Sequence, residues 1–293
     1  MARSKKGNGT KIVTRRAWLG SVSCVIESWR DLILAPGGAK GEVSPPPVAR
    51  VVNIGLALLV LIGAVWLSMW KLSYNWNWES VWDYRNALFS GWLMTLGVTA
   101  LALVLSTIGG FVMALGQRSA FLPLRYFVKV LVEMVRCTPL LVLILLVWYG
   151  FCTVFQIGNE YRYAAGIGIL TLFESAYISE IFRAGIEGVG QSQIESARAI
   201  GFTKVQTYRY VIIPQAIRQV LPPLVGQLVS LIKDSSLLSY IAIKEFTFSA
   251  QQVNSTTYST LEAYLPLAVG YLCLTVPISL WSRWLERRFK YET

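Results

Sequence analysis

The sequence predicts an all-α membrane protein with about six transmembrane helices, and its composition gives the first reason. Of the 293 residues, 54% are hydrophobic and 15% are charged, whereas soluble globular chains carry about 25% charged residues. The charges are also unequal, since 27 Lys and Arg stand against 16 Asp and Glu for a net charge of +11. A soluble nucleic-acid-binding protein can be this basic but not this apolar. We therefore expect a multi-span membrane protein with basic loops and no nucleic-acid partner.

Six windows of mostly apolar residues give the second reason, because about 20 such residues cross the hydrocarbon core of a bilayer. Three windows have no charge in their cores, and the other three carry two or three charged residues each. The windows are residues 51–70, 91–115, 127–151, 163–186, 215–241 and 261–284.

The distribution of Lys and Arg orients these spans, because cytoplasmic loops carry an excess of positive charge. With the N-terminus inside, 21 of the 27 Lys and Arg lie in inner segments or at their edges, and only four lie in outer loops. The remaining two, Arg136 and Lys233, lie within spans. We therefore expect both termini in the cytoplasm, and the net charge mainly records this orientation.

Several chemistries are excluded by what the sequence lacks. It has no His, so His-based acid–base catalysis and His metal ligation are impossible. Its four cysteines show no C-x-x-C spacing and are interpreted as small apolar residues. No G-x-x-x-x-G-K-[ST] motif occurs, so the chain does not bind a nucleotide through a P-loop. We expect no enzyme activity, cofactor or metal, because no nucleophile–base pair or metal constellation is visible.

The segment before the first span, residues 1–50, has a pattern of its own. Apolar residues at positions 18, 22, 25, 29 and 32 predict an amphipathic helix on the inner leaflet. No apolar run follows Lys5 and Lys6 within the signal-peptide window, so we expect the segment to be retained. After the first span, Trp76, Trp78 and Trp82 suit either an interfacial aromatic belt or the docking of an external partner.

The inner loop between the fourth and fifth spans, residues 191–214, is long, polar and helical in pattern. Apolar residues recur at helical spacing on both sides of Gly201. We expect Gly201 to close one short helix, Thr203 to cap a second, and Pro214 to lead into the next span. Helix connections are commonly about 2–8 residues, so we interpret this longer helix–turn–helix as a rigid peg for an internal partner.

The same loop carries a family motif. Glu195, Ser196 and Ala197 are followed after three residues by Gly201 and, after nine more, by V-I-I-P ending at Pro214. The run resembles the E-A-A-x3-G-x9-I-x-L-P signature of ABC importer permeases, with Ser at the second position. The resemblance implies that these five residues couple the chain to a separate ATPase subunit. A Glu near a helix start also has a simpler role, a favourable interaction with the helix dipole.

Three further stretches narrow the resemblance to the polar amino acid permeases. R-C-T-P-L-L at 136–141 is similar to that family's R-G-T-P-L-L, with Cys replacing Gly. The decapeptide at 174–183 resembles S-A-Y-x-A-E-I-x-R, and K-D-S-S-L at 233–237 is similar to K-D-T-S-L. The match covers about residues 87–290 and implies a permease domain with a five-span core. Residues 1–50 and the span at 51–70 look like additions to it.

Charged residues inside spans mark substrate paths by default, because they are costly in a bilayer and face the interior or water. At 1.5 Å per residue, Arg136 and Glu174 lie roughly 13 and 16 Å inside the nearest membrane edge, close to the midplane. We expect Arg136 near a substrate carboxylate and Glu174 near its ammonium group. The alternative for Arg136 is simple pairing with Glu133.

The expected path continues beyond these two charges. Pro139 is expected to break the helix beside Arg136 and expose carbonyls to a ligand. Lys233 and Asp234 are interpreted as a pair that gates the outer end. The remaining expected path residues are Thr138, Ser175, Tyr177, Glu180 and Ser235.

The resemblance implies a permease subunit of an ABC importer for polar amino acids in the bacterial inner membrane, working by alternating access. It also implies three partners: the ATPase subunit, an external solute-binding protein and a second permease subunit of the same or a similar chain. The alternative from another class is an ion-coupled secondary amino acid transporter or a channel that works alone.

Overall fold

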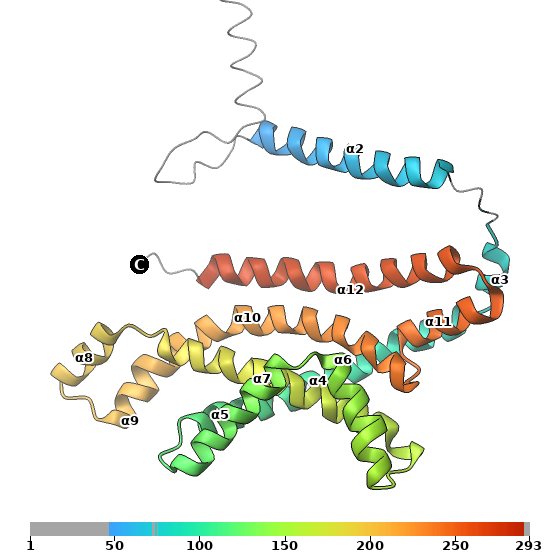
Figure 1. Ribbon diagram of the computed structural model, residues 1–293. Coiled ribbons are helices and arrows are strands. Elements are labelled where there is room, and N and C mark those ends of the chain that lie inside the picture. Colours follow the sequence, from blue (N-terminus) through green and yellow to red (C-terminus); the bar gives the residue numbers. More distant parts are fainter. Residues whose placement is uncertain (1–46, 72–73, 75, 290–293) are drawn as a thin grey trace, which may run out of the picture. The chain divides into compact units, whose positions relative to one another are not determined.

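The computed structural model describes residues 47–71, 74 and 76–289, and every regular element among them is helical (Figure 1). The prediction of an all-α fold is therefore confirmed. The chain divides into two units, residues 1–75 and residues 76–293, and each is described by itself.

The first unit is represented by α2, Pro47–Lys71, which coincides with the first predicted span. None of its apolar window Val51–Ser68 is buried. A helix that is apolar all round and uncovered by protein is suited to contact with lipid. The amphipathic helix predicted around residues 18–32 lies outside the described residues.

Three single helices of the second unit are long and apolar enough to cross a membrane, and they match predicted windows. Each helix extends past its window by a few residues at one or both ends, because membrane helices are often longer than the hydrocarbon core is thick. The three helices are α4, Arg85–Gln117, α7, Arg162–Glu187, and α12, Thr260–Phe289; the 3-10 helix η2, Asn159–Tyr161, leads into α7.

The third predicted window forms a bent pair of helices with an angle of 107° between its parts. Pro139 causes the break, because it lacks an N–H and forces the preceding residue out of the helical conformation. Thr138 is accordingly extended, with φ −100° and ψ 130°, and its hydroxyl donates to the Met134 carbonyl at 2.7 Å. The parts are α5, Leu122–Cys137, then α6, Leu140–Leu145, and the π-helix η1, Leu146–Cys152.

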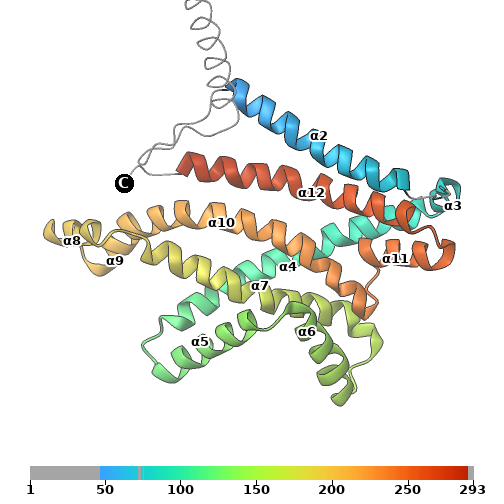
Figure 2. The ribbon, with the colours of Figure 1, turned by 45° about the horizontal axis from the view of Figure 1, so that its top comes forward.

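The fifth predicted window is helical but more polar than the spans. It forms α10, Ile213–Asp234, and the 3-10 helix η4, Ser235–Ile241, with Pro222 and Pro223 inside α10. By length and composition the described residues contain four spans, or five with the bent pair, where we predict six. The difference is α10, which lies between α7 and α12 in both ribbon views (Figure 2), so protein covers much of it.

Several short helices connect the long ones. The helix α11, which the sequence analysis does not predict, begins at a buried Glu245 whose carboxylate accepts two of its first backbone N–H groups. The short helices are α3, Trp78–Trp82, α8, Gln191–Ala199, α9, Lys204–Thr207, the π-helix η3, Tyr208–Ile212, and α11, Phe246–Thr257.

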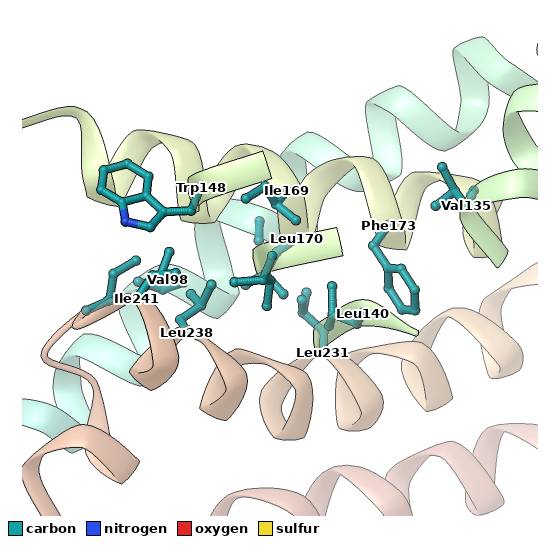
Figure 3. Close-up of a cluster of buried hydrophobic side chains, with 14 of the residues drawn as sticks. Val98, Val135, Leu140, Trp148, Ile169, Leu170, Phe173, Leu231, Leu238 and Ile241 are labelled. Carbon is teal, nitrogen blue, oxygen red and sulfur yellow. The ribbon is translucent and has the colours of Figure 1, made fainter. Parts of the chain in front are cut away.

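The main hydrophobic core surrounds α7. Side chains of α4, of the bent pair and of α10 with η4 meet those of α7 in one cluster, including Leu140, Leu170, Phe173 and Leu231 (Figure 3). The α4–α7 contact is close because α4 offers glycine there. A Cβ on Gly110 would lie 2.6 Å from the Ile178 side chain, so only glycine fits. Small residues at such crossings let membrane helices approach closely.

Candidate functional site

The predicted helix–turn–helix between the fourth and fifth spans is formed by α8, α9 and η3, and it projects beyond the ends of α7 and α10 (Figure 1, Figure 2). Gly201 has φ +86°, a left-handed conformation that favours glycine. Its N–H donates to the Arg198 carbonyl, and the Phe202 N–H donates to the Ala197 carbonyl, which ends α8. Thr203 and Gln206 then form a capping box at the start of α9.

The five residues predicted to couple the chain to an ATPase occupy different environments within this loop. Glu195 and Ser196 are exposed, while Ala197 is buried at 4% exposure and anchors α8. Glu195 lies beyond the first turn of α8, where the helix dipole acts weakly, so the simpler role does not explain it. Pro214 is the second residue of α10 and follows the π-helix η3 directly, so the helical chain is continuous through it.

The outer face of the same loop is apolar. Ile200 and Val205 flank the Gly201 turn with exposures of 73% and 75%, and Tyr210 is 61% exposed. The base of the loop is fixed, because the Gln215 amide donates to the Gln193 side-chain oxygen at 2.8 Å. The loop thus presents apolar side chains on a positioned turn, as a surface that docks into a partner does.

A buried carboxylate lies in α7, within the membrane-spanning core. Glu174 has no exposed surface, and its Oε2 accepts a hydrogen bond from Gln227 Nε2 of α10 at 2.6 Å. Its Oε1 has no hydrogen-bond partner. The Asp234 carboxyl is close enough to interact with Glu174. Buried polar atoms are normally paired, and the two neighbouring acids, Glu174 and Asp234, can satisfy each other by sharing a proton.

The second charged group of the expected path, Arg136, makes its contacts across the bundle. Its Nη1 lies 3.6 Å from Glu180 Oε2 of α7, and its guanidinium lies 5.5 Å from the centre of the Tyr177 ring. The described residues show no ion pair between Arg136 and Glu133, so the alternative of local pairing is not what the structure shows. Arg183 also holds Glu180, at 2.7 Å.

One cavity of about 480 Å³ joins these groups. Arg136, Tyr177 and Glu180 line it, and so does Gln227, whose amide reaches Glu174. The cavity therefore has charges of both signs on its wall and a carboxylate directly behind it. Its other lining residues are Ile181, Arg183, Ala184, Gly185, Gln219 and Pro223.

The other expected path residues do not line this cavity. Ser175 is buried where α7 meets α4, and its hydroxyl donates to the Ser106 carbonyl at 3.3 Å. Ser235 is buried and donates to the Ile232 carbonyl at 2.7 Å. Thr138 and Pro139 form the helix break. Lys233 is exposed, and the described ion pairs do not join it to Asp234.

Gln227 and Gln219 line the cavity from α10 but are not among the residues predicted for the path. Both are uncharged, and Gln227 lies 53 residues from the carboxylate that it contacts. The usable signal is that α10 places Gln215, Gln219 and Gln227 at intervals of four and eight residues, on one face of a helix expected in the membrane.

Together, the spans, the polar cavity and the projecting loop are the parts of a membrane transport subunit. Comparisons with known proteins define the class further. Residues 106–291 match the family model described as binding-protein-dependent transport system inner membrane component. The chain therefore belongs to this family of transport permeases.

Individual relatives agree with the family match. The chain is 34% identical over 214 residues to the probable glutamine ABC transporter permease protein GlnM of Bacillus subtilis strain 168, covering 73% of this chain and 98% of the relative. It is 31% identical over 218 residues to the glutamine transport system permease protein GlnP of Escherichia coli strain K12, covering 73% and 98%.

Solved structures show the same fold. A crystal structure of an amino acid ABC transporter with histidines matches with a TM-score of 0.69 and 35% identity, over 73% of this chain and all of that chain. An inward-facing structure of the MetNI methionine ABC transporter matches with a TM-score of 0.54 and 18% identity, over 72% and 98%, and it supports the fold alone.

Proposed function

We propose that the chain is the membrane-spanning permease subunit of an ABC importer for polar amino acids and forms half of an alternating-access path. The observation that carries the proposal is the Gly201 turn, where the family motif is folded into a fixed loop with apolar side chains outward. The names of the relatives, which include glutamine permeases and a glutamate/aspartate import permease, support amino acids as the substrate class.

ATP hydrolysis then belongs to a partner chain. The sequence has no P-loop motif, and an exposed apolar loop suits docking into a separate ATPase. In this proposal Glu195, Ser196, Ala197, Gly201 and Pro214 form the coupling site. A second permease subunit, the same or a similar chain, completes the path, and an external solute-binding protein delivers the substrate.

Reconstitution tests this assignment against a transporter that works alone. Proteoliposomes that hold this chain by itself should take up no amino acid, with or without an ion gradient. Uptake should require the ATPase, the binding protein and ATP together. Ion-driven uptake by the chain alone would refute the proposal and establish the secondary transporter.

The substrate path is proposed to run through the cavity bounded by Arg136, Tyr177 and Glu180. Glu174 supplies a carboxylate for a substrate ammonium group, and Arg136 supplies a cation for a carboxylate. The hydrogen bond that joins Glu174 to Gln227 on the cavity wall supports this assignment. The outer gate at Lys233 and Asp234 stays a prediction, because no ion pair joins them among the described residues.

Exchange of Glu174 for Gln tests the path. The isosteric amide keeps an acceptor for Gln227 but replaces the other carboxyl oxygen with an NH2 donor, so we expect the KM for uptake to rise about tenfold or more. Gln252→Asn on α11 is the control, since its conservative change lies outside the cavity. Transport by E174Q at the normal rate and affinity would remove Glu174 from the substrate site.

The location and boundaries are proposed as follows. The chain lies in the bacterial inner membrane with both termini in the cytoplasm, residues 87–290 form the permease domain, and 51–70 is an extra span after a cytoplasmic segment. Deletion of residues 1–70 should leave assembly with the ATPase intact. To test the topology, single cysteines are placed at residues 40 and 292. Both should react only with a reagent added on the inner side of the membrane.

A further inference from the structure

A second cavity, of about 500 Å³, lies at one end of α4, α5 and α7. Four cationic side chains line it, and the carboxylates that face it are fewer. The lining residues are Gln117, Arg118, Arg125, Lys129, Val132, Glu133, Glu180, Arg183 and Glu187. The cavity shares Glu180 and Arg183 with the candidate substrate path, but its third wall is the end of α4 instead of α10.

The charges of this cavity are not balanced at its mouth. Arg183 holds both Glu180 and Glu187 at 2.7 Å, so these three groups neutralise one another in part. Arg125 and Lys129 have no ion-pair partner among the described residues. Arg118 has no ion pair among the described residues either, and its Nη2 donates to the Tyr208 hydroxyl at 3.5 Å.

The remaining carboxylate, Glu133, lies farther along α5 than the two cations of that helix. Glu133 is one turn beyond Lys129 and two turns beyond Arg125, or roughly 6 and 12 Å along the helix axis. Its described contact is the Cys137 thiol, 3.6 Å from Oε1. An anion held by Arg125 and Lys129 therefore lies about one to two helical turns from Glu133, where the repulsion is weaker.

The surface beside the mouth is apolar. On α5, the stripe of Arg125, Lys129 and Glu133 has buried Val128 and Val132 on one side. On its other side, Tyr126 and Val130 are exposed, at 63% and 57%. A helix with this order of faces places a charged groove directly beside a surface suited to acyl chains.

We propose that this cavity binds the phosphate group of an anionic phospholipid of the inner leaflet, held by Arg118, Arg125 and Lys129 with its acyl chains along the exposed face of α5. Guanidinium and ammonium groups are the usual ligands of phosphate, and basic pockets between transmembrane helices bind lipid headgroups. The positive-charge pattern places this mouth at the inner leaflet.

Native mass spectrometry of the full-length protein in detergent, titrated with phosphatidylglycerol, tests the site. Each basic residue near such a headgroup contributes about a fivefold change in binding, so R125Q/K129Q should weaken it roughly thirtyfold. The control R283Q/R287Q removes two exposed charges at the same four-residue spacing on α12 and should change binding less than twofold. Phosphatidylcholine, which carries the same phosphate but no net charge, should bind more weakly than phosphatidylglycerol.

A second variant guards against misfolding as the explanation. E133Q removes the repulsive carboxylate, so it should strengthen phosphatidylglycerol binding severalfold, which a damaged protein would not do. Three results would overturn the proposal: equal binding by R125Q/K129Q and the native chain, equal losses in both double variants, or displacement of the lipid by millimolar inorganic phosphate. The last result would assign the cavity to a soluble anion.

Discussion

Replacement of Gly201 by Val should uncouple the projecting loop from transport without destabilising the membrane core. Gly201 has φ +86°, and a Cβ added there meets no atom within 4 Å, so the cost is purely conformational. A left-handed L-residue costs roughly 1–2 kcal/mol, and β-branching adds to this. Since 1.4 kcal/mol is a factor of ten, the native turn should become at least five- to thirtyfold less populated.

The assay is uptake and binding-protein-stimulated ATP hydrolysis by the assembled complex in proteoliposomes. Both should fall at least fivefold for G201V, while the thermal unfolding of the full chain stays within about 1 °C. Gly201→Asn should retain most activity, because Asn tolerates the left-handed region. Gly190→Ala is the matched control, since Gly190 precedes α8 at φ −56° and its added Cβ has only ordinary contacts. Normal coupling by G201V would refute this reasoning.

Two further predictions concern stability. Gly110→Val should lower the thermal midpoint of the purified chain, because the Ile178 side chain must shift and overpacking costs about 1–3 kcal/mol. Gly97→Ala is the control and should leave the midpoint unchanged, because a Cβ there meets no atom within 4 Å. Equal midpoints for the two variants would contradict the close α4–α7 contact. Glu245→Ala should cost about 2–3 kcal/mol, because it removes the buried acceptor of two α11 N–H groups. Glu245→Gln keeps one acceptor and should cost less, so the reverse order in thermal unfolding would contradict the capping role.

The spans can be predicted from the sequence because a helix that faces lipid needs apolar residues over most of its surface. The apolar window of α2, for example, has no buried residue and no charge, and it is apolar on every side. α10 carries less of this signal because neighbouring helices cover much of it, and Gln219 and Gln227 line a cavity. The bend at Pro139 was also predictable, since proline acts on its own backbone and on the preceding residue.

The contacts of the candidate site were not predictable in the same way. The sequence offered Glu133, three residues from Arg136, as the nearest partner, yet the structure pairs Arg136 with Glu180 of α7. The partner of Arg136 depends on how α5 packs on α7, and this tertiary contact cannot be read from residues close in sequence. α11 was missed for a related reason, because its start is fixed by a Glu245 carboxylate that also meets the Tyr271 hydroxyl, 26 residues away.

The connection between the two proposed sites follows from the continuity of one helical segment. α9, η3 and α10 run without interruption from Lys204 to Asp234, so the segment that begins in the projecting loop also carries Gln227 into the core. A hydrogen bond between Gln215 and Gln193 ties the base of α8 to the same helical segment. A rigid displacement of the loop would therefore also move Gln227, which donates a hydrogen bond to Glu174. Pro222 and Pro223 lie between the two ends, and each removes a backbone hydrogen bond. Any bending of this segment should therefore concentrate there, at the wall of the cavity that Pro223 lines.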